Sequence, residues 1–470
     1  MDAWKQDGEN GRRSPWPWAA AAGAVGLMVL SPIPATGDAG KGLRWKEPVE
    51  IASGNAYRGP WRMNESNFDF VDDPAVAVEG EDLIGIVWAD HSGQDIYFQS
   101  FNAGGEPRIE EAVNISCSPD IFSWLPRAVF ADADTVLVVW QEIVFSGGSH
   151  GGEIFFAHSG DGGDRFSEPE NLSNTTAGAA KGRLTRDMWD NGSLDIATGP
   201  GDDVYVAWTE YEGALRFRRS EDGGRNFSEA VEIVPEKAGT PARGPSIAVS
   251  PDGEVFLAWA VGEDSAADIY VARSDDRGRS FGEARSVNAS DGHSDAPSIA
   301  LDGDGVLHVA YGESPRGIRQ QYHLRYARSR DGGETFEDSR QIVSHDAHGG
   351  YAVHYPRLAV SGNGRVYLNW EHFPEPFPRP RGLGMRYSVD GGETFADPAL
   401  VDGTDDPALG FSGSQQGLLM RKLAVDAAGN PVVVNSTFRE GTGSRIWLHR
   451  GRSGEEDFDW DDIKHDLRAR

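Results

Sequence analysis

The stretch RYSVDGGETF, residues 386–395, decides the fold because the chain repeats it. Four near-copies precede it: AHSGDGGDRF (157–166), RRSEDGGRNF (218–227), ARSDDRGRSF (272–281) and ARSRDGGETF (327–336). Asp and Ser side chains lock turns by bonding nearby backbone groups, and glycine permits positive φ. We therefore interpret the shared phrase, Ser-x-Asp-x-Gly-x-x-Phe, as a fastening turn. Its acids have structural rather than catalytic roles: Asp161, Asp222, Asp276, Asp331 and Asp390.

Each phrase belongs to a larger unit of short apolar runs. In one unit, PSIAV (245–249) precedes a Gly/Asp turn, VFLAW (255–259) ends in an aromatic, and DIYVARS (268–274) leads into the phrase. A fourth short run then closes the unit. Four antiparallel strands that repeat roughly every 50 to 60 residues are typical of a β-propeller blade. Seven inner runs fit the pattern, so we predict an all-β propeller with seven blades; six blades are the alternative.

The ends of the chain set the expected boundaries. GLRWKEPVEIA (42–52) matches the end of a repeated phrase plus a fourth run, so we expect an N-terminal strand to complete the last blade. EDFDWDDI (456–463) is the rival closing strand. The predicted parts are a leader (1–39), the Asp-phrase propeller (40–453) and an acidic C-terminal tail or closing strand (454–470).

Composition and the N-terminus limit the partners and the location. The 470 residues have a formal net charge of −30, which disfavours nucleic acids and anionic membranes. Arg12 and Arg13 precede the apolar run AAAAGAVGLMVL (19–30), the pattern of a signal peptide. We expect a secreted or periplasmic protein, with a signal anchor as the alternative. No second run is long enough to span a membrane, and we expect a monomer.

Arginines, acids and histidines gather in the segments that the blade pattern places on the face opposite the Asp phrases, where a site is expected. Three arginines stand at or near the start of inner runs: Arg127, Arg357 and Arg421. Acids follow the second runs (Asp90, Glu142, Glu210, Glu313 and Glu371), and seven histidines lie in the same loops (His91, His150, His293, His345, His348, His354 and His372). Polar strand ends also form plain rim salt bridges, so two interpretations stay open: a rim, or a central pocket with an arginine clamp for a carboxylate.

The repeated phrase resembles the Asp-box, or BNR repeat, of the sialidase (neuraminidase) superfamily. That resemblance implies a propeller over about residues 42–450 and a carbohydrate or glycoconjugate ligand. It also implies an arginine clamp formed by Arg58, Arg127, Arg357 and Arg421, with Tyr355 as nucleophile and Glu371 or Glu313 as its helper. Arg58 stands in YRGPW (57–61), where sialidases have Arg-Ile-Pro.

Two functions follow from the resemblance. One is an exported glycosidase that hydrolyses acidic or complex glycans. The alternative is a non-catalytic propeller that binds glycan or protein as a scaffold, because Asp-boxes also occur in non-enzymatic assembly factors. No cofactor is required for either, although a ring of acids suits Ca²⁺. HDAH (345–348) is a weak zinc pattern, and the single cysteine, Cys117, excludes a disulfide within the chain.

Overall fold

The computed structural model describes residues 43–144, 152–175, 178–185, 188–235, 240–262, 267–318, 320–376, 379–414 and 421–452. These residues form strands joined by turns, with three short 3-10 helices: η1 (Met63–Glu65), η2 (Ala347–Gly349) and η3 (Pro407–Leu409). Within that part of the chain, no helix has the length and apolarity that a membrane crossing requires. The predicted leader and C-terminal tail, and His150, lie outside the described residues.

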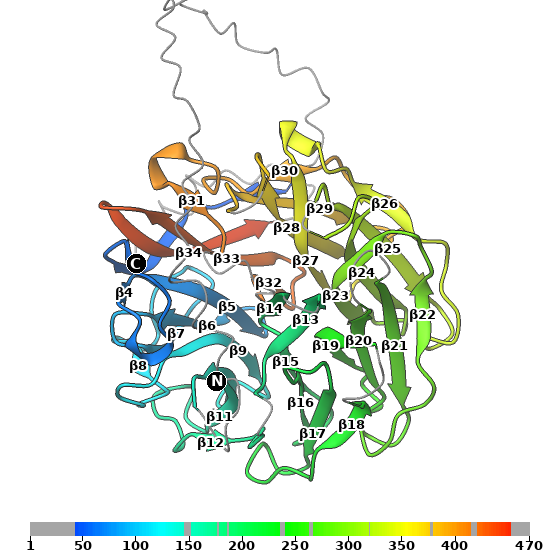
Figure 1. The fold of residues 1–470 in the computed structure, drawn as a ribbon, viewed down its shortest axis with the longest axis horizontal. Helices are drawn as coiled ribbons and strands as arrows, with labels where there is room; N and C mark the ends of the chain where they lie inside the picture. Colours follow the sequence, from blue (N-terminus) through cyan, green and yellow to red (C-terminus); the bar gives the residue numbers. More distant parts are fainter. Residues whose placement is uncertain are drawn as a thin grey trace, which may run out of the picture. The chain divides into compact units, whose positions relative to one another are not determined.

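The strands form seven blades around a central axis, and the innermost strand of each blade lies nearest that axis (Figure 1). Six blades each contain four consecutive antiparallel strands. They are, in chain order, β5 (Val71–Glu79) to β8 (Val113–Asn114), β9 (Ser123–Phe130) to β12 (Glu170–Asn171), β15 (Leu194–Thr198) to β18 (Val231–Val234), β19 (Ala242–Val249) to β22 (Arg285–Asn288), β23 (His293–Leu301) to β26 (Arg340–Val343), and β27 (Ala352–Val360) to β30 (Ala399–Leu400). The seven-bladed prediction is confirmed, and the six-bladed alternative is wrong.

The seventh blade combines the two ends of the propeller. Its inner strands are β32 (Leu423–Val425), β33 (Pro431–Arg439) and β34 (Gly443–Arg452), and β2 (Val49–Gly54) pairs antiparallel with β34 as the outer strand. The register places Val49 opposite Leu448 and Gly54 opposite Ser444. An N-terminal strand therefore closes the ring, as predicted. The rival segment 456–463 lies outside the described residues.

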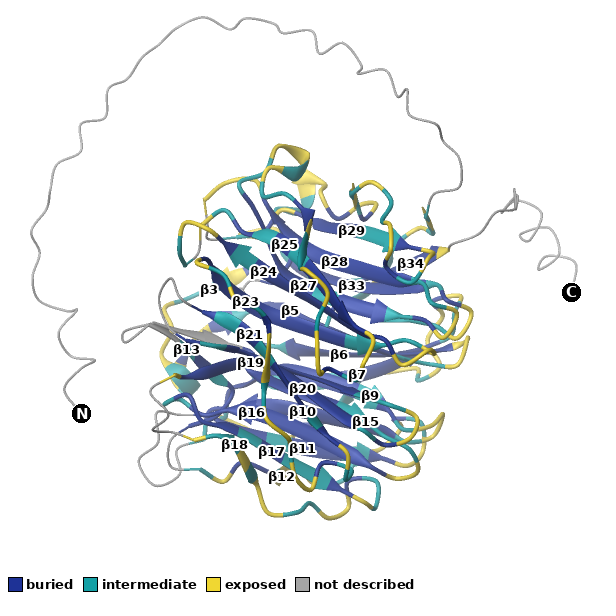
Figure 2. Ribbon diagram, turned by 90° about the vertical axis from the view of Figure 1, so that its right-hand side faces the viewer, coloured by how far each residue is buried: buried dark blue, intermediate teal, exposed yellow. Residues whose placement is uncertain are grey.

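The blades stack face to face, so their central strands are apolar on both sides. Trp140, Trp208 and Trp370, in the second strands of three blades, are fully buried. A fully buried large apolar side chain stabilises a fold by about 1.5–3 kcal/mol. Figure 2 shows these strands as buried and many of the loops at the blade edges as exposed. Polar residues that are buried at the strand ends near the axis therefore need a specific explanation.

The Asp-boxes lock turns and join neighbouring blades. In the first box, Ser159 Oγ donates to Asp161 Oδ1 at 2.8 Å, and the backbone N–H of Gly163 donates to Ser159 Oγ at 2.9 Å. The terminal Phe166 packs edge-on against Phe98 of the preceding blade, with ring centroids 5.4 Å apart. Equivalent edge-on contacts join Phe227 to Phe156, Phe281 to Phe217, and Phe395 to Tyr326. The repeated phrase thus fastens each of these blades to the one before it.

Candidate functional site

Five innermost strands carry a β-bulge immediately before a proline. The residue at each bulge has positive φ: Asp73 (54°), Leu125 (59°), Gly244 (59°), Ala296 (54°) and Tyr355 (54°). The strand pairing shifts register at the same places. A non-glycine residue in this conformation costs about 1–3 kcal/mol, and bulges of this kind re-aim side chains at sheet edges. The bulges lie beside buried polar residues, which include Asp72, Arg243, Asp295 and His354.

Three arginines surround one carboxylate at the axis. Arg127, Arg357 and Arg421 interact electrostatically with one another, and Asp195 opposes their mutual repulsion. Burial lowers the pKa of Arg127 to about 9; Asp195 counteracts this shift, while Arg357 and Arg421 add to it. Burial likewise lowers the pKa of Arg357 to about 10. Arg127, Arg357, Arg421 and Asp195 are called the axial arginine cluster below. The cluster contains three guanidinium groups and one carboxylate, so positive charge exceeds negative charge.

The contacts within the axial arginine cluster differ between its members. Arg421 Nη2 donates to Asp195 Oδ1 at 2.6 Å and to the carbonyl of Ile196 at 2.7 Å. Arg127 donates from Nη1 to the carbonyl of Pro126 at 2.9 Å. The buried Nε of Arg357 has no hydrogen-bond partner. Arg421 is therefore anchored through Nη2, while the Nε atoms of both Arg357 and Arg421 retain donor capacity.

A cavity of about 380 Å³ leads to the axial arginine cluster. Arg357 and Arg421 line its inner end, and aliphatic residues such as Ala77, Val129 and Leu423 form its walls. Glu79 and Thr198, at the ends of innermost strands, lie farther out. Because an innermost strand ends on the same face as the Asp-box turns, this cavity opens towards the Asp-box face. The sequence had favoured the opposite face for a site.

A second charged group lies beside the axial arginine cluster. Lys422 Nζ donates to Glu371 Oε1, and both side chains are almost fully buried. Glu371 Oε1 also accepts from the backbone N–H of Ser414 at 2.9 Å, while Ser414 Oγ donates to Asp73 Oδ1 at 3.2 Å. The other carboxylate oxygen of Glu371 has no partner. Glu371 is thus held as one half of a buried ion pair.

Two adjacent acids and a histidine form a compact group at the start of the first blade. Asp72, Asp73 and His91 are buried, and each offers a ligand atom within 4.8 Å of the others. Burial raises the pKa of Asp73 well above its ordinary value, and the charge of Asp72 raises it further. Burial lowers the pKa of His91 to about 3, with Arg58 adding to the effect. The group is called the Asp–Asp–His triad below.

A buried hydrogen-bond network crosses the fourth and fifth blades. Arg243 Nε lies 3.0 Å from Asp295 Oδ1, and Arg243 Nη2 lies 3.0 Å from His293 Nε2. The other ring nitrogen of His293 lies 2.9 Å from the hydroxyl of Tyr322, whose ring stacks on His354 with centroids 3.8 Å apart. Arginine only donates, so His293 Nε2 accepts and its Nδ1–H donates to Tyr322. Burial, which lowers the pKa of His293 to about 4, fits this neutral tautomer.

The predicted nucleophile and helpers have different surroundings. The ring of Tyr355 lies against that of His354 in a tilted arrangement, with centroids 4.1 Å apart, and packs with Ala296 and Phe373. Glu371 faces Lys422 and Ser414, as described above. Glu313 lies 3.7 Å from Arg325, between the outer parts of the fourth and fifth blades. The described contacts do not join these three residues around the cavity.

The predicted arginines divide into two groups. Arg127, Arg357 and Arg421 meet at the axis. Arg58 lies in β3 (Tyr57–Arg58), with its guanidinium 5.5 Å from the centre of the Phe68 ring and near His91. The two histidines of the HDAH pattern contact different partners, since His345 packs on His323 and His348 on His372.

Sequence reasoning missed Asp195, Lys422 and the Asp–Asp–His triad. A usable signal existed for Asp195, because it occupies the same strand position as Arg127 and Arg357. Each of these residues pairs with the residue just before a second-strand Trp: Ala207, Val139 and Asn369, respectively. In the seventh blade, one blade after that of Arg357, Lys422 occupies the equivalent position. The triad had a weaker signal, since Asp72 and His91 meet at one end of the β5–β6 strand pair but lie far apart in the sequence.

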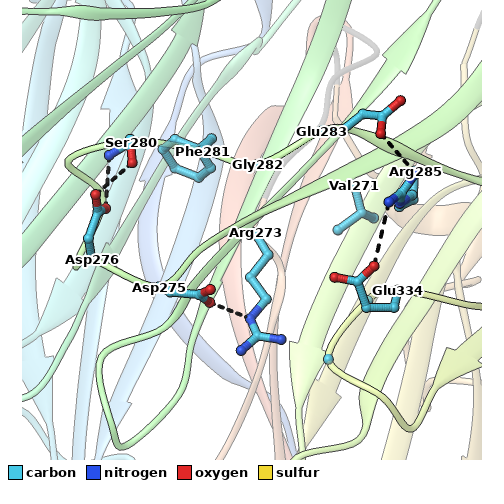
Figure 3. A pocket seen from close by; sticks show the side chains of 12 residues that line it. Val271, Arg273, Asp275, Asp276, Ser280, Phe281, Gly282, Glu283, Arg285 and Glu334 are labelled. Carbon is cyan, nitrogen blue, oxygen red and sulfur yellow. Dashed lines mark hydrogen bonds and ion pairs between the residues drawn. The ribbon is translucent and has the colours of Figure 1, made fainter.

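A shallow groove of about 330 Å³ lies between two neighbouring Asp-boxes (Figure 3). Its charged groups already pair with one another. Arg273 bonds Asp275 at 2.7 Å, and Arg285 bonds Glu283 at 3.1 Å and Glu334 at 3.6 Å. Asp276 is engaged with Ser280 within its own box. This groove is consistent with the fastening role of the boxes.

Comparisons with known proteins concern the fold and the family. A polysaccharide lyase of family PL25, an ulvan lyase bound to -[GlcA(1-4)Rha3S]-, superposes with a TM-score of 0.54 at 13% identity, over 89% of this chain and 99% of that one. A Dyadobacter fermentans protein of unknown function gives 0.47 at 14% identity, over 88% and 100% of the two chains. A Hadza microbial sialidase gives 0.41 at 14% identity, over 79% and 76%. No curated protein matches this chain.

The family match agrees with the repeated phrase and with the seven blades. The family described as BNR repeat-like domain matches residues 123–368, more than half of the 470-residue chain. The matched region begins at β9 and ends within β28 (Val366–Phe373), so it spans most of five blades. The chain belongs to the BNR repeat-like domain family.

Proposed function

We propose that the protein binds an acidic glycan and holds an anionic group of that glycan at the axial arginine cluster. The observation that carries this proposal is the excess of guanidinium over carboxylate at the inner end of the cavity. Arg357 and Arg421 line that end, and Asp195 is the carboxylate that faces them. Guanidinium groups bind carboxylates and sulfates through directed, charge-assisted hydrogen bonds.

The size and walls of the cavity support a small part of a glycan as the ligand. A volume of about 380 Å³ lies at the lower end of the range for small-molecule sites, roughly 300–1,000 Å³. The aliphatic walls offer apolar contact, and the polar groups are concentrated at the inner end. Such a cavity suits one terminal acidic sugar with its charged group innermost.

The test compares an acidic with a neutral sugar. Calorimetry of the full chain with the disaccharide GlcA(1-4)Rha3S and with a neutral disaccharide should show binding of the acidic one only. Arg357→Ala should weaken that binding about 10- to 100-fold, because it removes a charge-assisted hydrogen bond. Arg445→Ala is the matched control, since Arg445 pairs with Glu50 on the outside of the seventh blade. Equal affinity of the Arg357 and Arg445 variants would refute the proposal, as would binding of neither sugar.

Catalytic cleavage of a glycan is the second candidate function, and the hydrogen-bond network around Tyr322 favours it. A neutral His293 orients the Tyr322 hydroxyl, and Arg243 with Asp295 fixes the tautomer of that histidine. An oriented tyrosine is a competent proton donor for a glycan that reaches its hydroxyl, and Tyr322 is almost fully buried in this structure. A panel of fluorogenic glycosides, sialosides included, and a uronate oligosaccharide assay should reveal product that Tyr322→Phe loses. Binding without any product would leave the protein a glycan-binding propeller.

A further inference from the structure

We propose that the Asp–Asp–His triad is a binding site for a first-row divalent metal ion, with Zn²⁺ as the best-fitting candidate. Asp72 and Asp73 come from β5, and His91 follows the end of β6 (Leu83–Asp90) directly. One ligand atom from each residue lies within 4.8 Å of the other two. Small side-chain rotations bring such a set to the separations found around one ion.

Unpaired polar atoms in a buried place point to a missing partner. His91 is only 1% exposed, and neither ring nitrogen has a hydrogen-bond partner. Asp73 is fully buried, and its Oδ2 has no partner either. Native proteins rarely leave buried polar atoms unpaired, because the lost hydration is not replaced. An ion between them would satisfy both residues at once.

The backbone at the triad is held in an unusual conformation. Asp73 has a φ of 54° at the bulge, which places two consecutive acids on the same side of the strand pair as His91. The ring of His91 is fixed between Phe70 and Phe122, with centroid distances of 4.5 and 5.0 Å. The backbone N–H of His91 donates to the carbonyl of Phe70 at 2.9 Å. The ligands are therefore preorganised by packing rather than by contacts with one another.

The donor set selects the class of metal. One imidazole nitrogen and two carboxylate oxygens suit Zn²⁺ and its neighbours in the first transition row. Ca²⁺ takes six to eight oxygen ligands, so a histidine among three protein ligands disfavours it. Three protein ligands leave room for a water molecule or for a group of a ligand.

Hydrogen bonds from the Asp–Asp–His triad to the seventh blade indicate that an ion bound there would stabilise the closure of the ring. Asp72 Oδ1 accepts from Ser436 Oγ of β33 at 2.5 Å, and Asp73 Oδ1 accepts from Ser414 Oγ at 3.2 Å. Ser436 lies in β33 of the seventh blade, and Ser414 follows β31 (Phe411–Ser412), which pairs with β33. A metal ion at the triad would tie the first blade to the blade that closes the ring, beside Lys422 and Arg127.

Metal titration of the full chain tests the proposal. Chelator-treated protein is titrated with Zn²⁺ in millimolar Ca²⁺, which occupies weak surface carboxylates of this acidic chain. We expect one saturable Zn²⁺ site per chain and a rise of a few degrees in Tm, because the ion binds only the folded state. Co²⁺ in place of Zn²⁺ should give a visible absorption band from mixed nitrogen and oxygen ligands.

Variants decide where the ion binds. Asp73→Asn and His91→Gln, each shown to be folded by circular dichroism, should lose the site, the Tm shift and the Co²⁺ band. His345→Ala, which removes a histidine of the HDAH pattern, should keep all three. If Asp73→Asn binds Zn²⁺ as the unaltered protein does, or if His345→Ala loses it, the ion binds elsewhere and the proposal is wrong. Absence of any saturable site in the unaltered protein would also overturn it.

Discussion

Arg421 and Asp195 join opposite sides of the ring through a hydrogen bond of 2.6 Å between Nη2 and Oδ1, although 226 positions separate them in the chain. Arg421 lies two residues before β32, the innermost strand of the seventh blade, and Asp195 belongs to the innermost strand of the third blade. The same carboxylate accepts from the backbone N–H of Ile247 in the fourth blade at 2.9 Å. Asp195 therefore connects three blades while it offsets the charge of three arginines.

Neutralising Asp195 should destabilise the propeller strongly. Asp195→Asn leaves buried guanidinium groups without their counter-charge, which costs about 3–5 kcal/mol in comparable buried pairs. Urea denaturation measures the free energy of unfolding. Glu50→Gln, which breaks an exposed pair with Arg445, is the control and should change stability by no more than about 1 kcal/mol. Similar losses in the two variants would contradict the central role of Asp195.

The buried Lys422–Glu371 pair should show strong coupling. Glu371→Gln alone leaves the Lys422 ammonium buried without its partner and should cost about 3–5 kcal/mol. The double variant Glu371→Gln, Lys422→Met removes both charges and should recover much of that loss. A double-mutant cycle in urea gives the coupling energy, and additive losses would show that the two side chains do not depend on each other.

Two glycines in one Asp-box should respond very differently to a methyl group. Gly163 has a φ of 99°, and an added Cβ would lie 2.1 Å from Phe98 of the preceding blade. Gly160, three positions earlier, has no atom within 4 Å of an added Cβ. Gly163→Ala should cost about 2 kcal/mol or more, whereas Gly160→Ala should stay within about 0.5 kcal/mol. Thermal unfolding of both variants checks this, and equal Tm values would refute the fastening role of the contact with Phe98.

The Asp-boxes should make stability depend on acid pH. Hydrogen bonds from the side chain and backbone of Thr335 lower the pKa of Asp331 to about 2, from an ordinary value of 3.8. A lowered folded-state pKa stabilises above the ordinary value, and that contribution disappears as the pH falls to about 2. Asp331→Asn should therefore lose about 0.5–1 kcal/mol at pH 6, a small amount because the carboxylate is exposed. The difference in free energy of unfolding between Asp331→Asn and the unaltered protein should shrink below about pH 4. A difference that does not depend on pH would contradict this assignment.

The fold was predictable because its signal is repeated. Five Asp-boxes and seven inner runs each indicate the same pattern of strands and turns within a blade. One irregular copy therefore does not hide the period of the repeat. The closing strand was also visible, since residues 42–52 match a fourth strand that has no blade of its own. The sequence could not decide between that strand and 456–463, because strand pairing across the whole chain depends on tertiary contacts.

The site was predictable only in part. Arg127 and Arg357 occupy the same position of their innermost strands, and Arg421 stands next to that position in the seventh blade, where Lys422 occupies it. Matching positions in different blades imply a shared ring at the axis. Tyr355 was expected to face a ligand, but its positive φ at the bulge directs it against His354 and Phe373. A bulge shifts the side chains that follow it in its own strand, so the direction of Tyr355, at the bulge of β27, could not be read from alternation.

Closure by β2 has a consequence for how the protein is made. The strand that completes the ring, β2, is synthesised before the six complete blades, whereas its partner β34 is synthesised after them. Ser444 donates to the carbonyl of Asn55 at 2.6 Å across 389 positions of sequence. β2 therefore stays unpaired while the six blades between it and β34 are synthesised. If synthesis stops before residue 443, the propeller remains an open spiral, and its unpaired strand edge is available to a neighbouring chain.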